Sequence, residues 1–371
     1  AQAILAEAIV ITPFYCLCAI AMNICGVLLC CLLFRAGSAQ LPFPGFMFFP
    51  LDPEVGVVER VSSGMLTERL MGKAALIVGG TDGIGRGTAL VMAKAGANVA
   101  IVGHSPEKAR TTLANLSAVA YDPKKQHFHA YVADLLTVRG CLQFTERARA
   151  SGMRFDFVVL TVGIWPDHQH PKSGDGIDKV IALDVLARFL VTREMLPSLN
   201  PGARVLSVLG STVKFPKPPT IDAMKGLANG STAHYSLSDM LGTAGVMTDT
   251  WLRAMPAHYP EKNVSFIGTW PGLVSTDLVE TSQTFPAWLR PWLERGEKLV
   301  AMSPEESGLL HTTIITSPNV AGHKVAYFNV KLEGRQTNPL AYDDSFSELV
   351  WTFLEGLVAR RGGSSLDSIV V

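Results

Sequence analysis

The sequence lacks net charge, because its 32 lysine and arginine residues equal its 32 aspartate and glutamate residues over 371 positions. A neutral chain has no bulk attraction for a polyanion, so we expect no nucleic-acid partner. Cysteine is scarce outside residues 16–31, since only Cys141 of the six cysteines lies elsewhere. The sequence therefore predicts no disulfide framework, and the absence of zinc-type spacing predicts no metal site.

Charged residues are absent from Ile9 to Phe34, and Glu7 and Arg35 bracket this run. At ~1.5 Å per helical residue, the run is long enough for the ~30 Å hydrocarbon core of a bilayer. A cleaved signal peptide is the alternative, but the start is acidic and Arg35 interrupts the approach to the small-residue stretch "AGSAQ". We therefore expect a membrane anchor over residues 1–36 that contacts the lipid bilayer through residues 9–34. The basic residues that follow favour a main domain on the cytosolic or matrix side.

The remaining chain divides by composition into three segments. Residues 37–72 contain "LPFPGFMFFPLDP", which predicts a Pro/Phe-rich interfacial linker. From 73 to 335, apolar runs such as "AALIVGG" and "ANVAIVGHS" alternate with helical stretches. This alternation predicts an α/β fold, a Rossmann-type doubly wound parallel sheet that follows an N-terminal transmembrane helix.

Residues 336–371 predict a C-terminal amphipathic helical tail. The stretch "FSELVWTFLEGLVARR" carries apolar residues at helical spacing. Such a stripe fits packing on its own domain, contact with a membrane, or binding of another protein. The sequence leaves these three alternatives open.

A glycine-rich loop, "IVGGTDGIGRGTA", separates the first expected strand from the first expected helix. Glycines let the backbone turn sharply and approach a pyrophosphate at the helix N-terminus. A tight packing turn is the alternative, but the position after the first strand of an α/β pattern favours a nucleotide. The residues expected at the cofactor are Gly79, Thr81, Asp82, Gly83, Ile84, Gly85 and Arg86.

This loop resembles the "TGxxxGIG" motif of the short-chain dehydrogenase/reductase family, with Val78 where the family usually has Thr. "TDGIG" followed by a basic residue is similar to membrane-bound steroid and acyl-chain reductases of that family. The resemblance covers roughly residues 70–335. By the stretches "ADL", "LTVG" and "WPGLVSTDL", it implies further cofactor contacts at Asp134, Leu135, Gly163, Pro271, Gly272, Val274 and Thr276.

The second expected strand ends in "VGHS", which contains no acid. NAD-preferring proteins carry an acid there to hold the ribose hydroxyls. His104, Ser105 and Arg86 are more compatible with the 2′-phosphate of NADP. We therefore expect NADP(H), and NAD(H) is the less favoured alternative.

The catalytic set of the family is Asn, Ser, Tyr and Lys. At the positions that the resemblance assigns to this set, the chain carries different residues in several places. Tyr235 in "YSLSD" matches the Tyr, whereas Asp239 replaces the Lys that lowers the tyrosine pKa, and a carboxylate raises it instead. Asp184 replaces the Asn. Gly210 aligns with the Ser, and Ser211 one residue later is the alternative. The catalytic candidates are thus Tyr235 and Ser211, with Lys225 as another source of the missing cation.

Two functional hypotheses follow. The first is a non-catalytic accessory subunit of a larger membrane assembly, which binds NADP(H) and protein partners, by analogy with dehydrogenase-like subunits of mitochondrial respiratory complexes. It favours the mitochondrial inner membrane. The second is an active NADP(H)-dependent reductase of a lipophilic carbonyl such as a steroid, retinal or acyl chain, for which the endoplasmic reticulum is the alternative location. A nucleotide-responsive regulator is a third possibility.

Overall fold

The computed structural model describes residues 47–165, 172–209, 211–214, 222, 224–226, 237–276, 291 and 301–359. The predicted membrane anchor lies outside these residues and stays a prediction. Within the described part of the chain, no helix combines the length and the apolar character that a membrane crossing requires.

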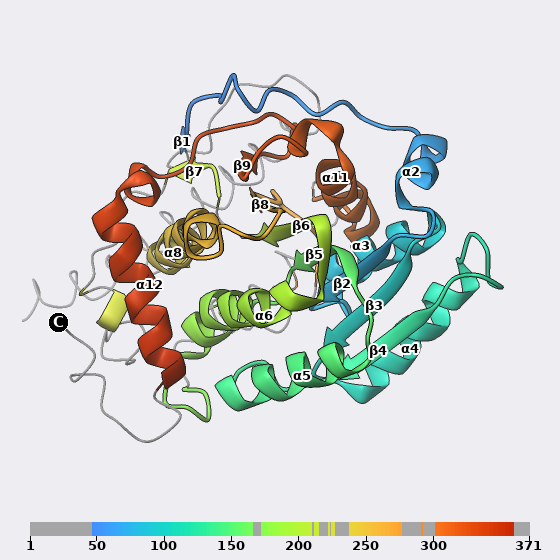
Figure 1. Cartoon of the computed structure of the whole chain (residues 1–371), viewed down its shortest axis with the longest axis horizontal. Coiled ribbons are helices and arrows are strands. Elements are labelled where there is room, and N and C mark those ends of the chain that lie inside the picture. The colour runs from blue at the N-terminus through green and yellow to red at the C-terminus, as the bar shows by residue number, and fades with distance from the viewer. Residues whose placement is uncertain are drawn as a thin grey trace, which may run out of the picture.

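A parallel β-sheet forms the centre of the structure (Figure 1). Over the described residues it has seven strands in the order β4-β3-β2-β5-β6-β8-β9, and all neighbours are parallel. The strands are β2 (Ala74–Val78), β3 (Asn98–Gly103), β4 (Phe128–Val132), β5 (Phe155–Leu160), β6 (Leu199–Val208), β8 (Val264–Thr269) and β9 (Val325–Phe328). The central strands are apolar and buried because helices cover both faces. The predicted doubly wound α/β fold is confirmed.

Helices cover the sheet in two layers, each with its own apolar core. One layer contains α2 (Ser63–Leu70), α3 (Gly83–Lys94), α4 (Pro106–Ala118) and α11 (Pro304–Thr316). The other contains α5 (Val138–Ala150), α6 (Ala187–Met195), α8 (Leu237–His258) and α12 (Asp344–Ala359). Shorter helical turns are the π-helical η1 (Ile181–Leu186) and the 3₁₀ turns η2 (Leu196–Ser198), η3 (Pro318–Val320) and η4 (Pro339–Tyr342).

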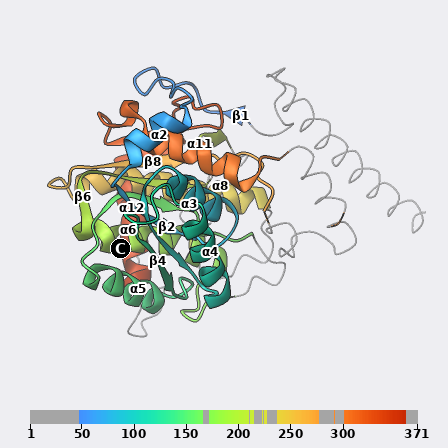
Figure 2. The ribbon, with the colours of Figure 1, turned by 90° about the vertical axis from the view of Figure 1, so that its right-hand side faces the viewer.

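Helices α3 and α11 lie side by side (Figures 1 and 2) and touch through glycine. A Cβ on Gly87 would collide with the carbonyl of Pro304, and a Cβ on Gly308 would collide with the backbone at Gly87. The two helices approach closely because neither has a side chain at this crossing. This packing fixes α3, whose N-terminus faces the expected cofactor site.

The strand order reverses between β2 and β5, since the chain builds β3 and β4 on one side of β2 and then places β5 on the other. In open α/β sheets, ligands bind in the crevice outside the carboxyl ends of the strands at such a switch point. The loops after β2 and β5 both open into this crevice.

The described part of the predicted linker is joined to the domain. Strand β1 (Met47–Phe48) pairs with β7 (Val213–Lys214) in a separate antiparallel sheet. Isolated bridges then join Leu51 to Arg335 and Val57 to Glu333. Beyond β1, the chain from residue 50 to 58 therefore lies along segment 332–336.

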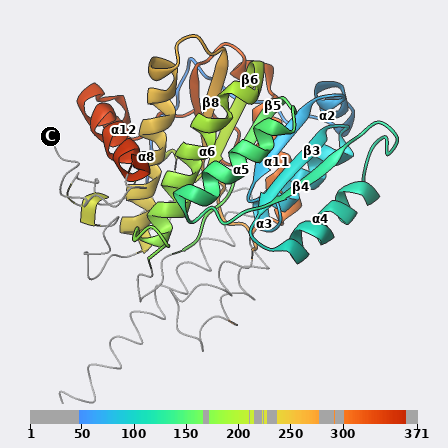
Figure 3. The same cartoon turned by 60° about the horizontal axis from the view of Figure 1, so that its bottom comes forward.

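The C-terminal stripe packs on its own domain, which is one of the three alternatives that the sequence left open. Trp351 of α12 lies with its ring 5.0 Å from that of Phe189 on α6 and stacks at 3.6 Å on His258 of α8. Figure 3 shows α12 beside α8, at the end of the sheet away from α4. The other apolar residues of the stripe that are buried are Phe346, Val350, Phe353, Leu354 and Leu357.

Candidate functional site

The glycine-rich loop after β2 folds tightly against the end of β5. Gly79 and Gly83 have φ angles of +87° and +46°, in the region that favours glycine. A Cβ on Gly79 would lie 2.7 Å from the amide nitrogen of Val162, and one on Gly85 would collide with the carbonyl of Gly79. The absence of side chains at these two glycines therefore lets the loop pack closely against the end of β5 and the first turn of α3.

Asp82 begins α3, because its Oδ1 accepts the Gly83 N–H at 2.8 Å. The N-terminus of a helix attracts an anion through its free N–H groups and its dipole. Thr81 is buried, and its side chain fills the space beside Gly103. Ile84 and Arg86 are partly exposed on the first turn. The loop thus has the conformation that a pyrophosphate requires, and these residues fit a dinucleotide.

The end of β3 provides a cation that the sequence analysis did not single out. Ser105 caps α4, since its hydroxyl accepts the Lys108 N–H at 3.2 Å, and His104 before it is exposed. The Lys108 ammonium forms an ion pair with Asp82. The signal was the sequence "HSPEK", in which a capping serine places the lysine on the first helical turn. A basic group therefore stands at the phosphate loop, next to His104 and Ser105.

The stretch with Asp134 and Leu135 follows β4 and stays close to the end of β3. The Ala133 N–H donates to the Gly103 carbonyl at 3.0 Å. Asp134 is exposed and accepts the Leu136 N–H at 3.0 Å, whereas Leu135 is buried. These residues border the β3 side of the crevice, where the resemblance places the adenine.

The stretch after β8 reaches the same crevice from the other side. Gly272 has a φ angle of +72°, and the Ser275 N–H donates to the Met302 carbonyl at 2.9 Å. A Cβ on Gly83 would lie 3.1 Å from the Cγ2 of Thr276. Pro271 directly precedes Gly272, and Val274 lies between Gly272 and Ser275. The structure thus brings this stretch and the glycine-rich loop together.

The loop after β5 rests on two buried charged side chains from η1 and α6. Asp184 accepts the Ile164 N–H at 2.8 Å. Arg188 donates to the Val162 carbonyl at 2.6 and 2.9 Å, to the Val208 carbonyl at 2.7 Å and to the Ser207 hydroxyl at 3.0 Å. A Cβ on Gly163 would lie 2.9 Å from Asp184 Oδ1 and 3.2 Å from an Arg188 nitrogen, which explains the glycine.

Burial changes the proton affinities of this pair. It raises the pKa of the Asp184 carboxyl to about 7, although the nearby Arg188 opposes the shift. It also lowers the pKa of Arg188 to about 10. Sequence reasoning did not find Arg188, because nothing in "LARFL" shows that this arginine turns inward to join the ends of β5 and β6.

Ser211, in the loop after β6, is buried. Its hydroxyl donates to the carboxyl of Asp249 on α8, and the Thr337 hydroxyl donates to the other oxygen of that carboxyl. Burial raises the pKa of Asp249 to about 7. Asp249 carried no signal in the sequence, because its partners are distant along the chain.

Tyr235 and Gly210 lie outside the described residues, and for Asp239 only the backbone at the start of α8 is described. The tyrosine–aspartate expectation therefore stays a prediction, as do the individual cofactor and catalytic assignments. In the described part of the chain, no three His, Cys, Asp or Glu side chains are grouped to hold a metal ion.

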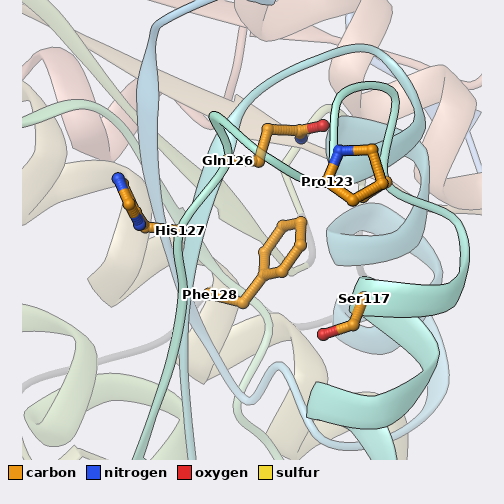
Figure 4. A pocket seen from close by; sticks show the side chains of 6 residues that line it. Ser117, Pro123, Gln126, His127 and Phe128 are labelled. Atoms are coloured by element: carbon orange, nitrogen blue, oxygen red, sulfur yellow. The ribbon is translucent and has the colours of Figure 1, made fainter.

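A hollow elsewhere on the surface does not belong to this crevice (Figure 4). It is lined by Ser117, Ala120, Pro123, Gln126, His127 and Phe128. These residues run from the last turn of α4 to the first residue of β4, so they lie at the amino end of the strands, opposite the glycine-rich loop. The side chain of Gln126 donates to the carbonyls of Ala93 and Ala97 at 2.9 and 2.7 Å, which is a structural role.

Comparison with known families gives a match over residues 73–217 to the family described as short chain dehydrogenase. Residues 73–217 are therefore similar to short-chain dehydrogenases. Proteins of this family bind a nicotinamide cofactor, and the glycine-rich loop lies within the matched residues.

Two relatives show how far the similarity to short-chain dehydrogenases extends. A protein of Streptomyces sp. (strain C5), named as a daunorubicin C-13 ketoreductase, is 32% identical over 186 residues, which are 49% of this chain and 60% of that protein. The polyprenol dehydrogenase of Homo sapiens is 23% identical over 291 residues, which are 76% of this chain and 83% of that protein. This chain therefore spans less than two thirds of the length of the Streptomyces relative.

A solved short-chain dehydrogenase from Burkholderia cenocepacia, in complex with NADP, has the same fold. Its TM-score is 0.51 at 20% identity, and the match covers 70% of this chain and 97% of that chain. At this identity the likeness supports the fold alone.

Proposed function

We propose that this chain binds NADP(H) in the crevice outside the carboxyl ends of β2 and β5 and acts as an oxidoreductase on a lipophilic carbonyl compound. The observation that carries the proposal is the glycine-rich loop. Gly79 and Gly83 turn the loop through positive φ angles, and Gly85 lets the first turn of α3 approach the Gly79 carbonyl. The capped N-terminus of α3 faces the crevice, and Thr276 stands against Gly83. These features are what a pyrophosphate and a nicotinamide need on the two sides of one crevice.

The preference for NADP(H) over NAD(H) rests on the end of β3. The two residues directly after that strand, His104 and Ser105, are not acids, and the Lys108 ammonium lies at Asp82 beside the phosphate loop. A side-chain cation that is half exposed can pair with a 2′-phosphate, whereas NAD(H) carries no charge there.

The lipophilic class of substrate is supported by the rim of the crevice. Ile164 and Trp165 follow β5 and are partly exposed, and Trp270 and Leu273 follow β8, where Leu273 is 44% exposed. Apolar side chains at a ligand crevice favour apolar ligands. Relatives named for daunorubicin, polyprenol and elsinochrome accord with that class.

The bound nicotinamide would supply a hydride to the substrate carbonyl. The chain itself provides Asp184 and Arg188, which hold the backbone of residues 162–164 at the floor of the crevice. By the family resemblance, Tyr235 is the candidate donor of the proton that the carbonyl oxygen takes up.

A second candidate is binding of NADP(H) without turnover, as in an accessory subunit. Its specific support is that the hydroxyl of Ser211 donates to Asp249, together with the acid at position 239. Relatives named as reductases and dehydrogenases favour the oxidoreductase. Protein partners and a mitochondrial inner-membrane location belong to the accessory hypothesis, and the endoplasmic reticulum belongs to the reductase.

One experiment separates the two candidates. The full chain is purified in mild detergent, and NADPH binding and NADPH oxidation are measured with a panel of steroid, retinal and polyprenyl aldehydes and ketones. Oxidation that Tyr235→Phe abolishes supports the oxidoreductase. NADPH binding without oxidation supports the accessory subunit, and no NADPH binding contradicts both.

Attachment to a bilayer through residues 9–34 is a separate proposal. It predicts that the protein stays in the membrane pellet after alkaline carbonate extraction. Release into the supernatant would contradict it.

A further inference from the structure

The buried carboxyl of Asp249 binds three elements that are distant in sequence. Asp249 is 2% exposed on α8. Its two carboxyl oxygens accept hydrogen bonds from the hydroxyls of Ser211 and Thr337. Ser211 follows β6, and Thr337 precedes η4. Its main-chain carbonyl accepts the Tyr327 hydroxyl of β9 at 2.9 Å. A buried carboxyl is costly unless such bonds satisfy it, so these contacts form a unit.

The residue after Ser211 has a strained backbone. Thr212 has a φ angle of +76°, which is unusual for a β-branched residue, and it is fully buried. Such a conformation persists only where the surrounding structure holds it. The Phe49 N–H donates to the Thr212 carbonyl at 3.0 Å, and β1 pairs with Val213 and Lys214 directly beyond it.

Segment 335–337 connects these two features. Arg335 donates to the Phe49 carbonyl at 2.9 Å, and the Gln336 N–H donates to the Pro50 carbonyl at 3.0 Å. The next residue, Thr337, is the one that binds Asp249. The contacts therefore close on themselves, from Ser211 through Asp249, Thr337 and residues 49–50 back to Thr212.

We infer that Asp249 is a positioning residue, and that it closes a hydrogen-bonded ring through which strand β1 and segment 335–337 set the loop after β6. This loop continues β6 at the carboxyl edge, on the side of the crevice that the proposed function gives to the substrate. Among the described contacts of the ring, none involves the glycine-rich loop after β2. Loss of one bond in the ring thus loosens the substrate side and leaves the nucleotide side intact.

The ring also decides what Ser211 offers to the crevice. A hydroxyl has one proton, and that of Ser211 is donated to Asp249. In this arrangement Ser211 can accept a hydrogen bond but cannot donate one to a substrate oxygen. An asparagine at position 249 can donate through its amide and so release the Ser211 proton.

The test is hydrogen exchange, measured by mass spectrometry on the full chain in detergent, with Thr337→Val as the variant. Removing the Thr337 hydroxyl leaves one Asp249 oxygen buried without its partner. We expect exchange at residues 47–50, 211–214 and 335–337 to accelerate roughly tenfold. Exchange over β2 and α3 should stay within about twofold of wild type, and so should the dissociation constant of NADPH.

A matched control is Thr250→Val, one residue from Asp249 on the same helix. The Thr250 hydroxyl is also buried, but it donates to the Val246 carbonyl at 2.7 Å within α8. This variant should leave exchange at residues 47–50 and 211–214 unchanged. Equal acceleration in both Thr→Val variants, or none in Thr337→Val, would overturn the inference.

Asp249→Asn gives an independent result, because the asparagine keeps the size and exchanges an acceptor for a donor. Hydrogen exchange at residues 47–50, 211–214 and 335–337 should accelerate less in Asp249→Asn than in Asp249→Ala. If the wild type fails to bind NADPH, the proposed function is contradicted. The exchange pattern still tests whether the hydrogen-bonded ring sets the loop after β6.

Discussion

On the β2 and β3 side, a glycine-rich loop shapes the crevice and the half-exposed Asp82–Lys108 ion pair lies beside it. The β5 and β6 side depends instead on buried charged side chains. Gly79 and Gly83 shape the first side through their positive φ angles. Asp184, Arg188 and Asp249 support the second, and each is nearly inaccessible to solvent. Backbone-built sites depend mainly on the presence of glycine, but a side-chain network fails when one member lacks its partner. The β5–β6 side should therefore be the more sensitive to single substitutions.

The largest effect is expected for Arg188→Met. The substitution leaves Asp184 without its nearby cation and removes the donors to the Val162 and Val208 carbonyls. Loss of one partner of such a buried pair lowers the free energy of unfolding by about 3–5 kcal/mol. Urea denaturation followed by circular dichroism measures this change.

The control for this prediction is Arg139→Met. Arg139 is an exposed residue on α5, so its loss should change the free energy of unfolding by less than about 0.5 kcal/mol. A change of similar size in both variants would show that the side-chain network at the end of β5 contributes no more to the free energy of unfolding than an exposed arginine does.

A pH dependence of stability should come next in size. The pKa of the Asp249 carboxyl is about 7 in the folded chain, against ~3.9 when unfolded. Because the folded state holds the proton more tightly, this contribution to stability is fully present below about pH 4 and is lost as the pH rises through about 7. Asp184 acts with the same sign.

The measurement compares urea midpoints of wild type and Asp249→Asn between about pH 5 and about pH 8. The wild-type free energy of unfolding should fall by about 1–3 kcal/mol more than that of the variant over this range. Parallel curves would contradict the assignment of a raised pKa to this carboxyl.

The smallest effect is expected on the nucleotide side, for Lys108→Glu. Reversal of this charge beside the phosphate loop should weaken NADPH binding about tenfold and change NADH binding by less than about threefold. Fluorescence titration measures both dissociation constants. Lys124→Glu, on the exposed loop after α4, is the matched control. An equal loss of NADPH affinity in this variant would show that net charge alone weakens binding.

The two sides of the crevice also differ in how well the sequence predicted them. The alternation of apolar runs and the position of "GGTDGIG" predicted the sheet and the loop, because each depends on residues adjacent in the chain. Arg188 and Asp249 were missed because their partners lie at positions 162, 208, 211 and 337. The pairing of β1 with β7 was missed for the same reason.

The tail shows a further limit of pattern reasoning. Its apolar stripe predicted a helix, and α12 confirms that helix, but periodicity does not indicate which surface an apolar face covers. The contact of Trp351 with Phe189 and His258 required three distant segments to come together.

The most direct test of the central claim is titration of NADPH into wild type, Gly85→Ala and Gly322→Ala. A Cβ on Gly85 collides with the Gly79 carbonyl, whereas Gly322 has open space around its Cα. The account predicts micromolar binding by wild type and Gly322→Ala, and a loss of at least about 30-fold in Gly85→Ala with the melting transition retained. Equal binding by all three proteins, or no binding by wild type, would contradict a nicotinamide nucleotide site at this loop.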